Sequence, residues 1–129
     1  MSYSIEHFPE LSVVVIDFGE DFGSVEEITA FASELNRLYN ALSAPVYQIA
    51  DVSRMKLDFE QAMDVIRLTV RSDKSIMKHP NNKGVVVVTT SRFYQLMIKG
   101  LNSAAFGMLK LQVFESLDAA MTWAREQAA

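Results

Sequence analysis

Cysteine is absent from this sequence of 129 residues, and its absence excludes several kinds of chemistry. Without thiols the chain forms no disulfide, has no thiolate nucleophile and builds no zinc–thiolate site. This composition is typical of a protein in a reducing compartment. The first residues, Met1–Glu6, lack both the basic and the apolar segment of a secretory signal. We therefore expect a cytoplasmic protein.

Long hydrophobic runs are absent too, although 50% of the residues are hydrophobic. The apolar runs are about six residues long, whereas a helix that spans a bilayer needs about 20. We therefore expect no membrane span. A chain of this length can bury one hydrophobic core, and no linker or repeat interrupts it, so residues 1–129 are predicted to form a single domain.

Histidine is scarce, because His7 and His79 are the only two and they stand far apart without a spaced partner. This pattern predicts neither a metal site nor a histidine base. Gly19 and Gly23 precede an expected helix start, where backbone N–H groups can hold a phosphate, but the acidic residues around them would repel it. We therefore expect no cofactor.

Four consecutive valines, Val85–Val88, are the centre of the fold prediction. A β-branched run has no polar face, which is typical of a parallel strand covered on both sides. The expected strands are residues 3–8, 11–18, 46–52, 84–88 and 109–114, and the expected helices begin near residues 24, 58, 93 and 116. This order predicts an α/β fold: a single-layer mixed, mostly parallel sheet of four to five strands, with an N-terminal hairpin turning at Pro9 and four helices.

Two helix starts carry capping residues three positions apart, Ser24 with Glu27 and Asp58 with Gln61. Each of these helices has an apolar stripe that is predicted to face the core. The stripe of the first helix comprises Val25, Ile28, Phe31, Ala32, Leu35, Leu38, Tyr39 and Leu42. The stripe of the second comprises Phe59, Ala62, Met63, Val65, Ile66 and Val70.

Charge is segregated along the chain, whose net charge is −4. Residues 1–53 hold nine acidic residues and one basic residue, whereas residues 54–110 hold four acidic and ten basic residues. The segregation suggests a polarised surface, unless the two segments interleave in space. No nucleic-acid-binding motif is present and no exposed aromatic residues alternate with the basic ones, so we expect no nucleic-acid partner.

Two segments resemble a known family. Ala50–Asp58, with the sequence ADVSRMKLD, is similar to the strand-to-helix junction of STAS domains, the anti-sigma-factor-antagonist family. Leu111–Trp123, with the sequence LQVFESLDAAMTW, is similar to the closing strand and helix of less characterised bacterial STAS-like proteins. The resemblance implies a STAS-like fold and a non-catalytic domain that presents a helix N-terminus and neighbouring loops to a partner protein.

The phosphorylation switch of that family is missing from this chain. STAS junctions typically read Asp-Ser-Ser-Gly at the helix start, whereas residues 58–61 here are Asp-Phe-Glu-Gln and the nearby hydroxyl, that of Ser53, belongs to the preceding loop. The resemblance therefore implies a regulatory or protein-interaction domain without that switch. The partner-docking loop is predicted to comprise Ser53, Arg54, Met55, Lys56 and Asp58, unless the loop is a solvated connection with Met55 or Leu57 against the core.

A catalytic interpretation uses the carboxyl ends of the parallel strands, where open α/β sheets bind their ligands. The residues expected there are Asp17, Asp51, Thr89, Thr90 and Glu115. Such a set could hold Mg²⁺ or accept a phosphoryl group, and it resembles that of response-regulator receivers. A receiver needs a lysine at the end of its last strand, but Lys110 stands at the beginning, and helix capping explains the same residues. We therefore predict no catalytic residues and no enzyme.

The third expected helix, residues 93–106, has an apolar arc of about 200°, wider than the ~100° stripe that packs on a sheet. A neighbouring helix, a homodimer contact or an apolar ligand pocket could cover this arc. The residues assigned to the dimer or ligand face are Phe93, Tyr94, Met97, Ile98 and Leu101. The alternative function is a carrier or sensor of a small apolar ligand or lipid, which requires an enclosed cavity of about 300 Å³ beside Tyr94, Met97 and Ile98.

Overall fold

The computed structural model describes residues 2–69, 79–101 and 111–128. The strands are β1 (Tyr3–Phe8), β2 (Val13–Phe18), β3 (Val46–Asp51), β4 (Asn82–Val88) and β5 (Gln112–Phe114). The helices are α1 (Val25–Ala41), α2 (Phe59–Thr69), α3 (Arg92–Leu101) and α4 (Leu117–Ala128), and a short 3₁₀ helix, η1, covers Pro9–Leu11. This is the predicted order of elements.

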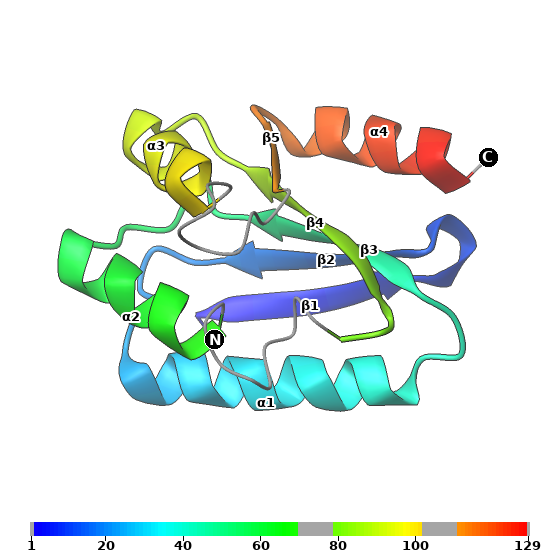
Figure 1. Ribbon diagram of the computed structural model, residues 1–129, viewed down its shortest axis with the longest axis horizontal. Helices are drawn as coiled ribbons and strands as arrows, with labels where there is room; N and C mark the ends of the chain where they lie inside the picture. Colours follow the sequence, from blue (N-terminus) through cyan, green and yellow to red (C-terminus); the bar gives the residue numbers. More distant parts are fainter. Residues whose placement is uncertain (1, 70–78, 102–110, 129) are drawn as a thin grey trace.

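The five strands form one sheet in the order β1-β2-β3-β4-β5. β1 pairs antiparallel with β2, and every other neighbouring pair is parallel. The structure therefore confirms the mixed, mostly parallel sheet with an N-terminal hairpin. Because each right-handed crossover moves one strand in the same direction, α1, α2 and α3 belong to one face of the sheet and α4 to the other. Figure 1 shows α1 along one side of the sheet and α4 along the other.

Alternation along β2 separates two hydrophobic cores. Val14, Ile16 and Phe18 face α1, whereas Val13 and Val15 face α4, since successive side chains of a strand point to opposite faces. The α1 core contains a cluster of four aromatic rings whose centroids are 4.8 to 5.9 Å apart. The rings are those of Tyr3, Phe18, Phe22 and Phe31.

The valine run behaves as predicted. Val85 and Val87 belong to the α1 core, and Val86 and Val88 to the α4 core. All four side chains are buried. A strand covered on both faces has no position for a polar side chain, which explains the unbroken β-branched sequence.

The predicted helix stripes were too wide. Val25 and Phe59 are the first residues of their helices and Met63 lies one turn after Phe59, and all three side chains are exposed. Side chains in a first helical turn lean back past the helix N-terminus, away from the sheet that the later turns cover. In the described part of α2, Ala62 is buried and Val65 is half-buried against the α1 core, as predicted, while the side chains of Ile66 and Val70 lie outside the described part.

One strand boundary also differs from the prediction. The second strand begins at Val13 instead of Leu11, because η1 occupies Pro9–Leu11 and Ser12 closes it in a left-handed conformation with φ 53°. Proline at the first position of a short helix is favoured because it has no N–H to leave unpaired. The predicted end of the third helix and start of the last strand, within residues 102–110, lie outside the described residues.

Candidate functional site

Two neighbouring loops at the carboxyl edge of the sheet contain most of the predicted site. The β2–α1 loop covers residues 19–24, and the β3–α2 loop covers residues 52–58. The strands that lead into them are parallel neighbours, with Asp17 opposite Asp51. The two loops therefore leave the sheet side by side.

The β3–α2 loop has its own internal hydrogen bonds. The Asp51 carboxylate oxygen Oδ1 accepts from the Ser53 N–H at 3.0 Å and from the Ser53 hydroxyl at 2.6 Å. The Met55 N–H donates to the Val52 carbonyl at 3.1 Å. The first half of the loop is therefore a closed turn, and Asp51 is engaged in holding it.

A side chain from α3 fixes the second half of the loop. The Tyr94 hydroxyl accepts from the Leu57 N–H at 2.8 Å and donates to the Met55 carbonyl at 3.0 Å. One hydroxyl thus satisfies two backbone groups on a loop that is 37 residues away in sequence. Sequence reasoning placed Tyr94 on a dimer or ligand face and missed this role. The available signal was the Tyr94 hydroxyl within an otherwise apolar arc, because a partly buried tyrosine needs a hydrogen-bond partner.

Two ion pairs connect the β3–α2 loop with the end of β2 and with the β2–α1 loop. The Arg54 guanidinium lies 3.3 Å from the Asp17 carboxylate, and the Lys56 ammonium lies 3.2 Å from that of Glu20. The basic side chains are 64% and 77% exposed, so each pair contributes at most about 1 kcal/mol to stability. The acidic first part of the chain and the basic middle part therefore interleave at this edge.

The start of α2 completes the site. The Gln61 N–H donates to the Asp58 carboxylate at 2.7 Å, and the Asp58 N–H donates to the Gln61 side-chain oxygen at 3.1 Å, which confirms the predicted helix start. Phe59 follows the cap and is 68% exposed. A Cβ atom on Gly23 would lie 3.0 Å from the side-chain ends of Gln61 and Leu57, so a larger residue there would require both side chains to shift.

The residues of the catalytic interpretation are engaged in local structure. Asp17 pairs with Arg54, and Asp51 holds Ser53. Thr89 is buried, with its hydroxyl accepting from the Ser91 N–H at 3.0 Å. Thr90 and Glu115 are exposed. Within residues 2–69, 79–101 and 111–128, no three acidic or histidine side chains gather as ligands for a metal ion.

The predicted face of α3 is divided by the structure. Tyr94 binds the β3–α2 loop and Ile98 is buried in the α1 core. Met97 is half-buried, and Phe93 is 40% exposed. Leu96, which follows the same arc, is 68% exposed, while the side chain of Leu101 lies outside the described part. The exposed remainder of the arc is therefore centred on Phe93 and Leu96.

An apolar cavity of about 120 Å³ lies between the sheet and the α1–α2 layer. Its described lining residues are Phe18, Phe22, Ile28, Phe31, Gln48, Ala50, Val52, Met55, Val65, Val85 and Val87. Met55, a residue of the predicted docking loop, is half-buried against this core. The cavity is smaller than the volume that the carrier hypothesis requires, and its described lining does not include the α3 residues named for that hypothesis.

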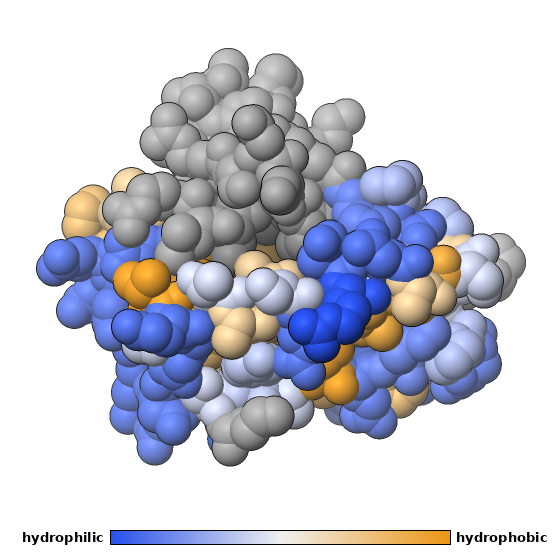
Figure 2. All heavy atoms as spheres, turned by 90° about the horizontal axis from the view of Figure 1, so that it is seen from below, coloured by the Kyte–Doolittle hydropathy of each residue, from blue (hydrophilic) through white to orange (hydrophobic). Residues whose placement is uncertain are grey.

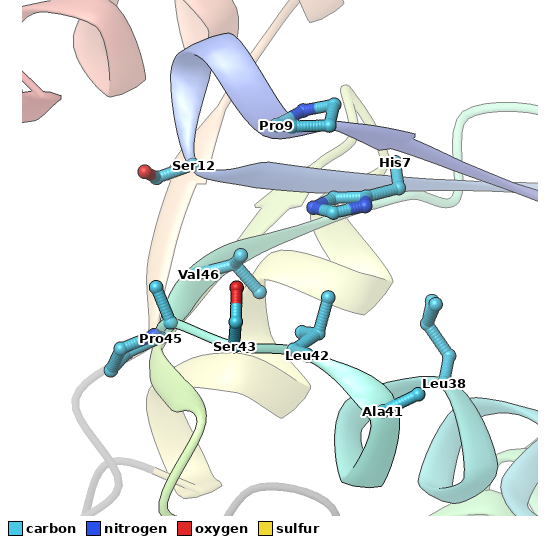
Figure 3. A pocket seen from close by; sticks show the side chains of 10 residues that line it. His7, Pro9, Ser12, Leu38, Ala41, Leu42, Ser43, Pro45 and Val46 are labelled. Carbon is cyan, nitrogen blue, oxygen red and sulfur yellow. The ribbon is translucent and has the colours of Figure 1, made fainter.

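A larger pocket, of about 300 Å³, lies at the opposite edge of the sheet. Figure 3 shows it between the end of β1 with η1 and the end of α1, with His7 directed into the space above Leu42 and Leu38. Its walls are mostly apolar, and its polar side chains come from His7, Ser12 and Ser43.

On the face in Figure 2, hydrophobic residues form only small separate areas among hydrophilic ones.

Among the described residues, three ionisable groups have shifted pKa values. Hydrogen bonding from Ser2, and then from the backbone N–H of Ser24, lowers the pKa of Glu27 below 4.5. The Tyr3 hydroxyl donates to the Glu34 carboxylate at 2.6 Å, and this bond raises the pKa of Tyr3 to about 12. Burial raises the pKa of Tyr39. Glu27 and Tyr39 lie on helix α1 and Tyr3 bonds to Glu34 of that helix, so none of the three groups belongs to the β3–α2 loop.

Comparison with known proteins gives a structural match. No protein-family model and no curated protein matches the sequence. A solved structure from Shewanella loihica, an uncharacterized protein of the DUF3478 family with a SpoIIAA-like fold, superposes with a TM-score of 0.64. The match covers 95% of this chain and 91% of that one, at 15% sequence identity. This chain has a SpoIIAA-like fold.

The SpoIIAA-like fold confirms the STAS-like architecture that residues 50–58 and 111–123 suggested. At this level of identity the similarity concerns the fold alone, so the function must be argued from the site itself.

Among the helices of the described part, none has the length and apolar character needed to cross a membrane.

Proposed function

We propose that this chain is a non-catalytic regulatory domain that binds a partner protein through the β3–α2 loop and the start of α2. The docking residues are Ser53, Arg54, Met55, Lys56 and Asp58, to which the structure leads us to add Phe59. The observation that carries the proposal is a preformed loop with two exposed cations, Arg54 and Lys56, that leads into a helix whose first residue, Phe59, is an exposed aromatic.

Preorganisation favours binding by this loop. Tyr94, Asp51 and the Asp58 cap already hold its backbone, so association loses little conformational entropy there. Aromatic and arginine side chains are enriched among residues that dominate binding energy, which fits Phe59 and Arg54. The surface ion pairs are weak enough to be exchanged for acidic groups of a partner.

Phosphorylation does not regulate this loop in the proposal. The Ser53 hydroxyl donates to Asp51, so a phosphate on Ser53 would lose that bond and lie beside a carboxylate. We therefore expect no phosphate on residues 53–61 in protein from its native cell. Mass spectrometry checks this, and a phosphopeptide from that segment would contradict it.

The docking proposal is tested with an Arg54→Glu/Lys56→Glu variant and a Phe59→Ala variant. Because all three side chains are exposed, the free energy of unfolding should change by about 0.5 kcal/mol or less per substitution. Affinity-purified complexes from the native cell should lose the same partner with both variants. The matched controls are Lys99→Glu and Arg125→Glu, which reverse exposed cations on α3 and α4. Equal recovery of every partner by the loop variants and the controls would refute the proposal.

A second candidate function is the carrying of a small apolar ligand, although the cavity of about 120 Å³ is smaller than the volume that this hypothesis first required. An apolar cavity of about 150 Å³ is known to take up benzene, so a ligand here is limited to a comparable group. Binding to the folded state raises its stability. A higher melting temperature in benzene-saturated buffer would support the carrier, and an unchanged one would remove it.

Homodimer formation remains a proposal that Phe93 and Leu96 support, because both are exposed apolar residues on one helix. Light scattering over a range of protein concentrations measures the oligomeric state. A monomer at high concentration would remove the dimer, and a dimer that Leu96→Gln dissociates would assign it to this face.

A further inference from the structure

A pocket of about 260 Å³ lies on the α4 side of the sheet, near the amino end of β4. It is therefore on the opposite face and the opposite edge from the β3–α2 loop. Its described walls are Tyr47, Lys83, Gly84, Gln112, Trp123 and Gln127, with Val85 and Val86 behind them. No acidic side chain is among these walls.

Gly84 contributes an open position to the pocket. It stands opposite Tyr47 in the pairing of β3 with β4, where the alternation of β4 directs a side chain toward α4. Since glycine has no side chain, the space over Gly84 beside the Tyr47 ring stays open. The rings of Tyr47 and Trp123 border it, with centroids 4.9 Å apart at 73°. A glycine usually weakens the interior of a strand. Here the missing side chain of Gly84 leaves the rings of Tyr47 and Trp123 accessible from the pocket.

The polar groups around these rings favour an anion. The Lys83 ammonium lies 4.9 Å from the centroid of the Tyr47 ring. No ion pair found among the described residues includes Lys83, so no described carboxylate neutralises it. The exposed amides of Gln112 and Gln127 add neutral hydrogen-bond donors and acceptors. A cation beside aromatic walls is complementary to a planar ring that carries a negative group.

We propose that this pocket binds a small aromatic anion, with its ring against Tyr47 and Trp123 and its carboxylate or similar group at Lys83. An apolar cavity of about 150 Å³ holds benzene, so the larger pocket has room for one ring and its charged substituent. A cationic aromatic is disfavoured by Lys83. A ligand with a saturated ring would lack aromatic stacking on Tyr47 and Trp123. An uncharged aromatic ligand would lack the ion pair with Lys83.

Benzoate is the probe for this site, and Trp123 is the reporter because it is the only tryptophan in the sequence. The single indole N–H signal in NMR spectra reports events at the pocket. We expect benzoate to shift this signal saturably at constant ionic strength. Benzamide and cyclohexanecarboxylate should bind several-fold more weakly, and benzylammonium should not bind. Equal shifts by all four compounds, or no shift with benzoate, would overturn the proposal.

Two variants test the named contacts. Lys83→Gln should weaken benzoate binding several-fold and leave benzamide binding unchanged, because it removes the charge alone. Gly84→Leu should abolish binding of both, since its side chain fills the open space beside Tyr47. A Cβ atom at Gly84 meets the nearest Tyr47 ring atoms at 3.4 Å, an ordinary contact, so the strand has room for the substitution.

The controls separate a lost site from a lost fold. Lys99→Gln removes an exposed cation on α3 and should bind benzoate as the natural sequence does. Thermal unfolding of Gly84→Leu verifies that it is folded, and Gly84→Ala is the smaller change if it is not. Benzoate binding that survives both Lys83→Gln and a folded Gly84 variant would contradict the site. The partner-docking residues lie on the other face, so this result is independent of the proposed function.

Discussion

The two faces of the sheet are covered in different ways. On one face, α1, α2 and α3 are crossover connections, and their core includes large side chains such as Phe31, Leu35 and Tyr39. On the other face the described part provides one long helix, α4, with the short η1 beside it, and the buried residues of α4 are Ala120 and Ala124. Small residues one turn apart let a helix approach the sheet closely at its centre, while larger rings stand at its margins. A face covered by one long helix therefore leaves room for a pocket.

The largest expected effect tests this contrast directly. Leu35→Ala removes a fully buried side chain from the α1 core and should lower the free energy of unfolding by about 2–5 kcal/mol. Met121→Ala removes a half-buried side chain from the α4 core and should cost about 1 kcal/mol. Urea unfolding measures both values.

Equal losses for the two variants would contradict the contrast. The slope of the free energy against urea should also stay constant in both variants, because each change affects packing and leaves the surface exposed on unfolding almost unchanged. A reduced slope for Met121→Ala alone would mean that α4 detaches separately from the rest of the domain.

Smaller losses in the free energy of unfolding are expected when single hydrogen bonds are removed, and they should differ between the interior of the α1 face and its rim. The buried Tyr39 hydroxyl donates to the Gln48 side-chain oxygen at 2.8 Å, so Tyr39→Phe should cost about 1–2 kcal/mol. Asn82 also donates to that oxygen, at 3.4 Å, which limits the loss. Tyr3→Phe deletes an exposed bond to Glu34 and should cost about 0.5 kcal/mol or less. A larger loss for Tyr3→Phe would reverse the assignment of interior and rim.

The smallest effect concerns the charge at the start of α1. The pKa of Glu27 is lowered below 4.5, so the folded state favours its carboxylate form. Its contribution to stability is present above pH 4.5 and is lost as the pH falls through the lowered folded pKa. Glu27→Gln keeps a capping-box residue but removes this titration, so it should unfold more easily than the natural sequence at pH 7 and nearly alike at about pH 3.

Urea midpoints at the two pH values check this expectation, with Glu26→Gln as the control. Glu26 is also in the first turn of α1, but no hydrogen bond of the described part involves its side chain. A pH-independent difference between Glu27→Gln and the natural sequence would show that the Glu27 carboxylate contributes no charge effect.

Local rules predicted the elements of this fold from the sequence. The valine run, the residue pairs Ser24–Glu27 and Asp58–Gln61 and the helix stripes each act within one element, so their signals are complete in a short stretch of chain. The order of elements with short connections then restricted the sheet topology through right-handed crossovers. The position of the β3–α2 loop was also predictable, because it follows a strand and precedes a helix cap.

Only the tertiary structure decided which side chains meet across the sheet. Tyr94 reaches the β3–α2 loop from 37 residues away, and the absence of a side chain at Gly84 matters only because Tyr47 and Trp123 stand beside it. Periodicity indicates which side of a helix is apolar, but not how far a neighbouring element covers it, which is why Phe59 and Met63 were wrongly placed in the core. Coverage depends on the distances between elements, and those follow from the packing of the whole chain.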